Sequence, residues 1–171
     1  MRANLSTVAH FSLLSVVSVV LLSACAEKQK VAAAPMRADP DGLGVVIAEP
    51  VISVAAGTSC GETVTQGAAE RFKSATAGAL TKAGFAVVTD EKEQAFIAQL
   101  ELEIDYCSDA GVVSGTTALQ FKRKTGASVW RGQAVGDQAR GETASSTVSE
   151  LVEGMLFDPR VIKATKEARS N

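Results

Sequence analysis

Histidine is almost absent from this chain of 171 residues: the single histidine is His10, and none follows it. Ser-His-Asp and Cys-His catalysis both need an imidazole, so both are excluded for the rest of the chain. Zinc sites of the HExxH type are excluded for the same reason. Only two cysteines follow residue 25, too few for a Cys₂His₂ or Cys₄ zinc site. We therefore expect no metal, no cofactor and no enzymatic activity.

Long apolar runs and a strong charge of one sign are also missing. The most apolar stretch covers residues 11–22, whereas a helix that spans a bilayer needs about 20 largely apolar residues. The formal net charge is −2, and the charged residues are scattered along the chain. No basic patch is present that would bind nucleic acid, so we expect no nucleic-acid partner.

The N-terminal stretch is typical of a secretory signal peptide, with Arg2 ahead of a short apolar region that ends in small residues. Leu22-Ser23-Ala24-Cys25 resembles the lipobox of bacterial lipoproteins. In that family the cysteine thiol receives a diacylglyceryl group, the chain is cut before the cysteine, and the new amino terminus is usually acylated. The resemblance implies a signal peptide over residues 1–24 and a lipid anchor, palmitate included, at Cys25. The alternative is an uncleaved signal anchor that ends in a chance cysteine.

The residues after the lipobox predict where the protein is held. Ala26, not Asp, follows the cysteine. By resemblance to the sorting rule of Gram-negative bacteria, this favours the outer membrane over the inner membrane. Residues 25–42 are rich in Ala, Pro and charge, which is typical of a flexible tether. Residues 43–171 have the length of one domain, which we expect to face the periplasm.

Cys60 and Cys107 are expected to form a disulfide bond. An exported protein meets an oxidising compartment, where an even pair of thiols tends to bridge. The chain-entropy model assigns a loop of about 48 residues roughly 4 kcal/mol of stabilisation. Two separate buried thiols are the alternative.

Hydrophobic patterning predicts an α+β fold, an α/β sandwich with a single mixed sheet of about 4–5 strands and two main helices packed on it. The predicted order is β-α-β-(α)-β-β-β-α. Strands are expected at residues 43–54 with a bend or an edge position at Pro50, and at 85–88, 96–106, 116–123 and 129–135. Capping boxes at Thr63–Gln66 and Thr147–Glu150 are expected to open the two long helices, Gly84 to end the first, and Asp158-Pro159 to open a short final helix.

The connections predict strand directions. A right-handed β-α-β crossover makes the strands at 43–54 and 85–88 parallel, and the strand at 96–106 has the same direction if the short connection after Val88 also crosses over. Cys60 and Cys107 then both follow the carboxyl ends of parallel strands, on one edge of the sheet. The predicted disulfide and the predicted topology are therefore consistent.

The strand at 96–106 alternates apolar and polar residues, so one of its faces carries Glu101, Glu103 and Asp105. Successive carboxylates on such a face lie about 7 Å apart, a distance at which two of them could share acid–base work. We interpret the face as solvated or, alternatively, as a strip that binds a partner protein. A glycan hydrolase that uses only carboxylates is the remaining catalytic alternative.

Two other features have simple structural interpretations. Lys124-Thr125-Gly126 matches the KTG element of penicillin-binding proteins and β-lactamases, but the S-x-x-K element that those enzymes need is missing. We therefore interpret the triplet as a hairpin turn. Trp130 is interpreted as a packing residue of the following strand, with a ligand platform as the alternative.

Two stretches carry a further resemblance: A-x-x-F…AL-x-x-x-GF-x-VV over Ala69–Val88 and TG-x-x-VW over Thr125–Trp130. Together they resemble the small α/β domain shared by the TolB N-terminal domain, the penicillin-binding-protein activator LpoB and the curli-secretion lipoprotein. Members of this group bind other proteins and are not catalysts, so no active-site residue is carried over. This chain departs from them in its pair Cys60 and Cys107, and it lacks segments that would form a secretion channel.

These observations predict a lipid-anchored lipoprotein that acts in the periplasm as a non-catalytic protein-binding adaptor or assembly factor. Its expected partners are the membrane, through the lipid anchor, and another envelope protein. The alternative is a periplasmic carrier that holds a small apolar ligand or an envelope component in an apolar cleft.

Overall fold

A computed structural model of the chain describes residues 36–108, 113–137 and 141–170. The predicted signal peptide, the predicted lipidation site Cys25 and the tether up to residue 35 lie outside these ranges. Within the ranges, no helix combines the length and the apolar character that crossing a bilayer requires.

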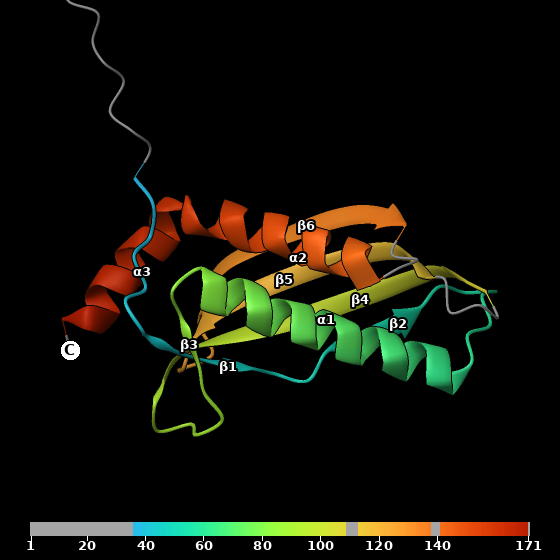
Figure 1. Cartoon of the computed structure of the whole chain (residues 1–171), viewed down its shortest axis with the longest axis horizontal. Helices are drawn as coiled ribbons and strands as arrows, with labels where there is room; N and C mark the ends of the chain where they lie inside the picture. Colours follow the sequence, from blue (N-terminus) through green and yellow to red (C-terminus); the bar gives the residue numbers. More distant parts are fainter. Residues whose placement is uncertain (1–35, 109–112, 138–140, 171) are drawn as a thin grey trace, which may run out of the picture. The chain divides into compact units, whose positions relative to one another are not determined.

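In the part of the chain that the structure describes, one mixed sheet of six strands carries three helices. The elements are β1 (Gly44–Ile47), β2 (Val51–Val54), α1 (Glu62–Lys82), β3 (Ala86–Val87), β4 (Gln94–Cys107), β5 (Val113–Arg123), β6 (Ser128–Asp137), α2 (Gly141–Leu156) and α3 (Pro159–Arg169). The strand order is β3-β1-β4-β5-β6, and β2 also pairs with β4 (Figure 1). The predicted α+β class, with a single mixed sheet and helices packed on it, is confirmed.

The strand predicted at residues 43–54 is present as two strands. β1 pairs in parallel with β4 from Gly44 to Ile47, and β2 resumes parallel pairing with β4 at Val51. Pro50 lies between them, and a proline has no backbone N–H to donate to the ladder. The predicted bend is confirmed, and this division accounts for the sixth strand.

The predicted strand directions are also confirmed. β1 is parallel to both β3 and β4, while β5 is antiparallel to β4 and to β6. The carboxyl ends of β2 and β4 therefore lie side by side, with Val54 in register with Ile104.

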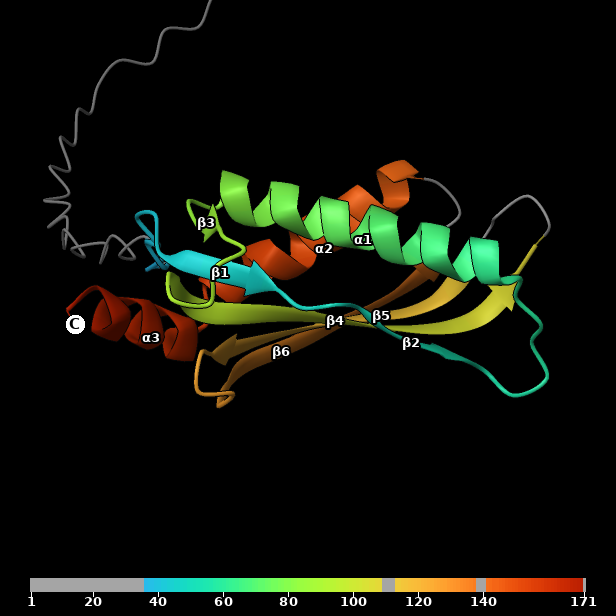
Figure 2. The ribbon, with the colours of Figure 1, turned by 90° about the horizontal axis from the view of Figure 1, so that it is seen from below.

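Helices α1 and α2 lie side by side on one face of the sheet, as Figure 2 shows, and α3 lies against α2 and β6. The alternation in β4 explains the choice of face, because its apolar residues from Phe96 to Ile104 are buried and the residues between them are more exposed. Helix α1 contributes Phe72 and Leu80 to the interface, both of them buried. Each buried side chain of this size stabilises the fold by about 1.5–3 kcal/mol.

Three phenylalanine rings form an aromatic cluster in the core, at one end of the sheet. The rings of Phe96 and Phe121 are stacked with centroids 4.7 Å apart, and the ring of Phe85 contacts both edge-on. Phe85 follows the end of α1, so this contact joins that end of the helix to β4 and β5.

Helix α1 ends as predicted but begins differently. Gly84 has a φ of 100°, its N–H donates to the carbonyl of Thr81, and the N–H of Phe85 donates to the carbonyl of Leu80. This pattern is a Schellman motif, which favours glycine. The predicted capping box at Thr63–Gln66 is wrong, because the helix begins at Glu62 and its N-cap, Gly61, makes no side-chain bond.

The C-terminal helices show one wrong and one confirmed prediction. Helix α2 begins at Gly141, so the predicted capping box at Thr147–Glu150 lies inside the helix. The side chain of Asp158 accepts a hydrogen bond from the backbone N–H of Arg160, with Pro159 at the first helical position, as predicted.

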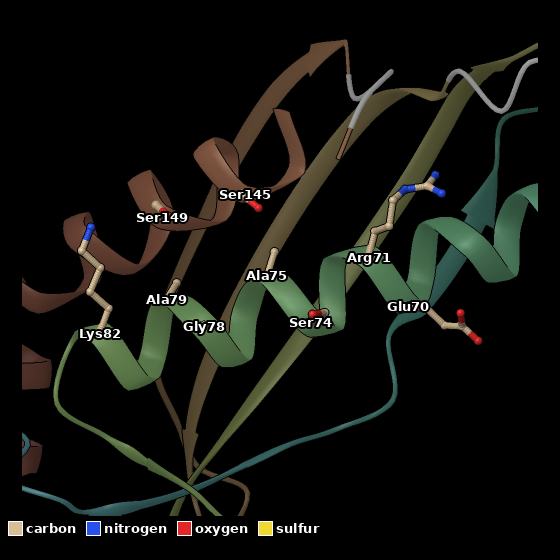
Figure 3. Close-up of a pocket in the computed structure, with 9 residues that line it drawn as sticks. All are labelled: Glu70, Arg71, Ser74, Ala75, Gly78, Ala79, Lys82, Ser145 and Ser149. Atoms are coloured by element: carbon tan, nitrogen blue, oxygen red, sulfur yellow. The ribbon is translucent and has the colours of Figure 1, made fainter. Parts of the chain in front are cut away.

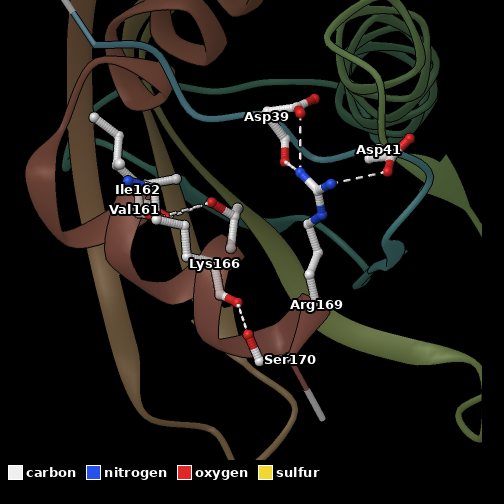
Figure 4. Close-up of polar contacts among 8 residues, drawn as sticks. Asp39, Asp41, Val161, Ile162, Lys166, Arg169 and Ser170 are labelled. Carbon is white, nitrogen blue, oxygen red and sulfur yellow. Dashed lines mark hydrogen bonds and ion pairs between the residues drawn. The ribbon is translucent and has the colours of Figure 1, made fainter.

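The segment ahead of β1 is held against the C-terminal helices. The N–H of Ala38 donates to the carbonyl of Leu156, and Ala38 is buried. Arg169 of α3 forms ion pairs with Asp39 and Asp41, at 2.9 and 3.1 Å (Figure 4). Residues 38–41 therefore pack against α2 and α3.

Candidate functional site

The face of the sheet opposite the helices is not covered by any element in the described ranges (Figure 2). We call it the open face. Strand pairing brings side chains from four strands together on it. They are Val51 and Ser53 of β2, Gln99, Glu101 and Glu103 of β4, Thr116, Ala118, Gln120 and Lys122 of β5, and Arg131, Gln133 and Val135 of β6.

Glu101 is the centre of a polar network on the open face. Its carboxylate accepts a hydrogen bond from Arg131 Nη2 at 2.8 Å and another from Gln120 Nε2. The side chains of Arg131 and Glu101 are 51% and 33% exposed, so this ion pair contributes about 0–1 kcal/mol to stability. The carboxylate is therefore engaged by a cation and an amide, not by a second carboxylate.

The other two predicted acidic residues are at one end of the same face. Glu103 and Asp105 are both exposed, and Asp105 lies at a bulge where the pairing of β4 with β5 shifts. The backbone carbonyl of Asp105 accepts a hydrogen bond from Thr58 Oγ1 at 2.8 Å. The structure thus places the predicted carboxylates on one exposed strand face. Glu101 is paired, whereas Glu103 and Asp105 form one end of the face, which we call the acidic end.

Apolar side chains accompany these charges. Val51 is 51% exposed and Val135 is 77% exposed, at opposite edges of the open face. Tyr106, next to Asp105, is 56% exposed. A hollow of about 200 Å³ between the polar groups is lined by Val51, Ser53, Glu103, Thr116, Arg131 and Gln133, among others. Such a shallow surface suits a protein better than a small molecule, whose sites are usually deeper and more enclosed.

The disulfide between Cys60 and Cys107 is present at the acidic end, with their Cα atoms 5.5 Å apart. Cys60 immediately precedes the N-cap of α1, and Cys107 is the last residue of β4. Both sulfurs pack beside a small apolar cluster that contains Ala68 and Ile104. The bridge therefore ties the start of α1 to the end of the strand that carries Glu103 and Asp105.

A second hollow lies on the helical side, between α1 and α2 (Figure 3). It measures about 560 Å³ and is lined by small residues of both helices, including Ala75 and Gly78 of α1 and Ser149 of α2. Arg71 and Lys82 stand toward its two ends. Small residues let the two helices approach closely, which explains this lining without a ligand.

The predicted turn at Lys124-Thr125-Gly126 is confirmed: the N–H of Gly126 donates to the carbonyl of Arg123, and Gly126 has a φ of 86°. The side chain of Arg123 turns toward α3 and donates to Glu167 at 2.5 Å. That hydrogen bond lowers the pKa of Glu167. The basic residues beside the turn are therefore partly engaged in holding α3.

Trp130 is half-buried and lies over the backbone of Gly132. A Cβ atom on Gly132 would be 2.3 Å from the Trp130 ring, so the glycine makes room for the indole. The residue is in contact with the main core, in agreement with its interpretation as a packing residue.

Sequence reasoning missed Arg131 and Gln120, which hold Glu101. Both lie in strands where apolar and polar residues alternate, which indicates the face of the sheet on which each side chain lies but not the residues that it contacts. Arg131 of β6 reaches Glu101 of β4 across β5, so this contact depends on the registers of two strand pairs. Within the described ranges, no group of three or more His, Cys, Asp or Glu side chains could hold a metal ion.

No family model matches the sequence, and no curated protein matches it. Among solved structures, the chain is similar to a PelC dodecamer from Paraburkholderia phytofirmans, at 15% identity and a TM-score of 0.48, over 68% of this chain and 90% of PelC. It is also similar to protein XCC0632 from Xanthomonas campestris, at 12% identity and a TM-score of 0.45, over 75% and 88% of the two chains. Lipoprotein GNA1162 from Neisseria meningitidis matches at 14% identity and a TM-score of 0.40, over 64% and 96%. At these values the function has to be inferred from the residues of this chain.

Proposed function

We propose that this protein is a lipid-anchored lipoprotein of the cell envelope that binds another protein through the open face of its sheet. The anchor is Cys25 in the outer membrane, and the domain faces the periplasm. The protein acts as a non-catalytic adaptor or assembly factor. The lipobox supports the anchor, and the uncovered face supports the binding role.

The observation that carries the binding role is that one whole side of a six-stranded sheet has no covering layer in the described ranges. Most sheets with a solvated face carry polar side chains on it. Here the polar centre around Glu101 is accompanied by Val51 and Val135, which are more than half exposed. Exposed apolar groups around satisfied polar ones are typical of surfaces that bind proteins.

The charges on this face indicate the chemistry of the partner. Glu103 and Asp105 form the acidic end, whereas Lys122 lies toward the other end, where its Nζ donates to Gln99 at 2.6 Å. A partner surface that places Lys or Arg over the acidic end, with an apolar residue near Val51, complements this pattern. Such complementarity acts mainly on association rate and specificity.

Site-specific photo-cross-linking in intact cells tests this proposal. A photoreactive amino acid replaces Ser53, which is exposed on the open face, in the full-length chain. We expect one specific protein adduct. The same amino acid at Ser74, an exposed residue of α1 on the other side of the domain, serves as the matched control and should give no such adduct.

Charge reversal then tests the acidic end. Glu103→Lys combined with Asp105→Lys should remove the adduct formed at residue 53. Glu70→Lys combined with Glu150→Lys changes the same number of exposed carboxylates on the helical side, away from the disulfide, and should leave the adduct in place. Adducts of equal yield from residues 53 and 74, or an adduct that survives reversal of the acidic end, would contradict binding through this face.

A carrier function is the second candidate, and one hollow favours it. A groove of about 500 Å³ between α1 and the β1–β3 edge is lined mainly by apolar side chains, among them Val46, Ile47, Ala77 and Val87. An apolar lining of this size could hold an acyl chain. Mass spectrometry of the purified protein under native conditions should detect a bound lipid if the carrier function is the right one.

A further inference from the structure

Strand β6 is the last strand of the sheet on its side, and in the described ranges its only neighbour is β5. It runs over ten residues, Ser128–Asp137. Its outer edge therefore presents backbone donors and acceptors along a length that exceeds the usual strand. An edge of this kind is a template for pairing with another chain.

The usual protections of an edge strand are weak here. From Trp130 to Val135 the strand has no proline, no lysine and no acidic residue. Its one charge, Arg131, is turned inward across the sheet to Glu101 at 2.8 Å. One bulge is present, at Val129, which is skipped between the pairs Phe121–Trp130 and Lys122–Ser128. The regular and unprotected part of the edge thus begins at Trp130.

We propose that β6 pairs with β6 of a second copy of this chain, antiparallel and about a two-fold axis that passes through Gln133. The two sheets then continue into one another, with the open faces on the same side and the helices of both copies on the other side.

The position of the axis follows from the bulge and from the pleat. Residues opposite each other in an antiparallel pair must point to the same face, so the two residue numbers must sum to an even value. Pairing centred on Gln133 places Trp130 opposite Gly136 and uses only the regular stretch. A centre at Gly132 would place Val135 opposite Val129, which is buried and lies in the bulge.

The side chains fit this register. Val135, which is 77% exposed, lies opposite the aliphatic stem of the partner copy's Arg131, and the two Gln133 amides can act as mutual donors and acceptors. The two Arg131 side chains are four residues apart along the strands, about 13 Å, which exceeds the Debye length of about 8 Å in physiological salt. On the helical side Gly132 lies opposite Ala134 and Trp130 lies opposite Gly136, so each of these pairs contains a glycine.

Pairing of β6 with β6 of a second copy is favoured over head-to-tail pairing of β6 with the opposite edge of another copy's sheet, because the strands at that opposite edge are short. The outer edge there is formed by β3 and β2, which have two and four residues. Pairing of β6 with either would match less than half of its length and would leave open ends. Self-pairing of β6 satisfies the long edge in both copies and closes with two-fold symmetry, as most soluble oligomers do.

Disulfide trapping tests this proposal in the full-length protein in membranes. Gln133→Cys places two cysteines directly opposite each other, with Cα atoms about 5 Å apart, within the range of a disulfide. We expect mild oxidation to convert this variant into a covalent dimer on a non-reducing gel. Val135→Cys is the matched control, because its two cysteines would be about 13 Å apart and should not cross-link. The unmodified chain gives the background.

A charge on the edge provides the second test. Val135→Lys introduces one of the residues that commonly protect edge strands, at a site exposed enough to leave the fold intact, which circular dichroism checks. Added to Gln133→Cys, it should lower the cross-linked fraction about tenfold. Val51→Lys, on the opposite edge, should leave it unchanged. Cross-linking at residue 135 equal to that at 133, or none at 133, would overturn the proposal.

Discussion

Substitution of Gly115 by alanine should destabilise the protein by about 2–3 kcal/mol. Gly115 pairs with Ile104 on β4, next to the bulge at Asp105. A Cβ atom at residue 115 would lie 1.9 Å from the carbonyl oxygen of Glu103, whereas carbon and oxygen atoms of neighbouring strands approach to about 3.3 Å. The two strands must therefore separate locally by roughly 1.4 Å, which breaks two or three ladder hydrogen bonds at about 1 kcal/mol each.

The unfolded chain and the bulge each make a smaller contribution to this loss of stability. Alanine restricts the unfolded chain more than glycine does, which returns about 0.4–1 kcal/mol to the folded state. Residual strain at the bulge costs a similar amount, so these two effects offset each other and the net loss stays near 2–3 kcal/mol. The change also displaces the strand that carries Glu103, so the acidic end should bind its partner less tightly.

Urea unfolding of the purified chain, followed by the fluorescence of Trp130, measures the loss. Gly78→Ala is the matched control: a Cβ atom there has nothing within 4 Å, and the residue lies inside α1. This control should gain about 0.5–1 kcal/mol from its higher helix propensity. If Gly115→Ala unfolds at the urea concentration of the unmodified chain, the close approach of β4 to β5 is not as described.

Three other predictions concern the anchor, the disulfide and α3. Cys25→Ser should abolish incorporation of labelled palmitate and release the protein from membranes, as fractionation of cells will show. Replacing both Cys60 and Cys107 by serine should lower the free energy of unfolding by about 2–4 kcal/mol in urea titrations. Hydrogen bonds from the side chain and backbone of Arg160 lower the pKa of Asp158 below its ordinary value. Asp158→Asn should therefore lower stability by about 0.5–1 kcal/mol at pH 7, a difference that disappears as the pH falls through the lowered pKa.

The elements of this fold could be predicted where the chemistry of a single residue, or a short periodic pattern, determines the local structure. Pro50 cannot donate to a ladder, and β1 and β2 are divided there. Gly84 adopts the positive φ that ends α1. Period-two alternation identified β4, because a two-layer fold buries one face of that strand. These signals are local, so a single sequence is enough to read them.

Helix starts could not be predicted in the same way. Thr63 and Thr147 each precede a Gln or Glu by three residues, yet both lie inside helices. Such a pair stabilises a helix start only if the chain ahead of it is not helical. For α1, that condition is set by Cys60, which the disulfide holds beside the end of β4. A contact distant in sequence thus decides where a local motif acts.

In the candidate site, too, the sequence predicts the face on which a residue lies but not the strand register that decides its partner. Alternation placed Glu101, Glu103 and Asp105 on one face, but it treated them as equivalent. Pairing across β5 brings Arg131 to Glu101 and to neither of the others. Because a paired carboxylate has already exchanged water for a cation, a partner gains little from contacting it. The bulge at Asp105 and the disulfide at Cys107 hold the remaining two acids exposed at the end of the strand, and binding specificity should therefore depend on them more than on Glu101.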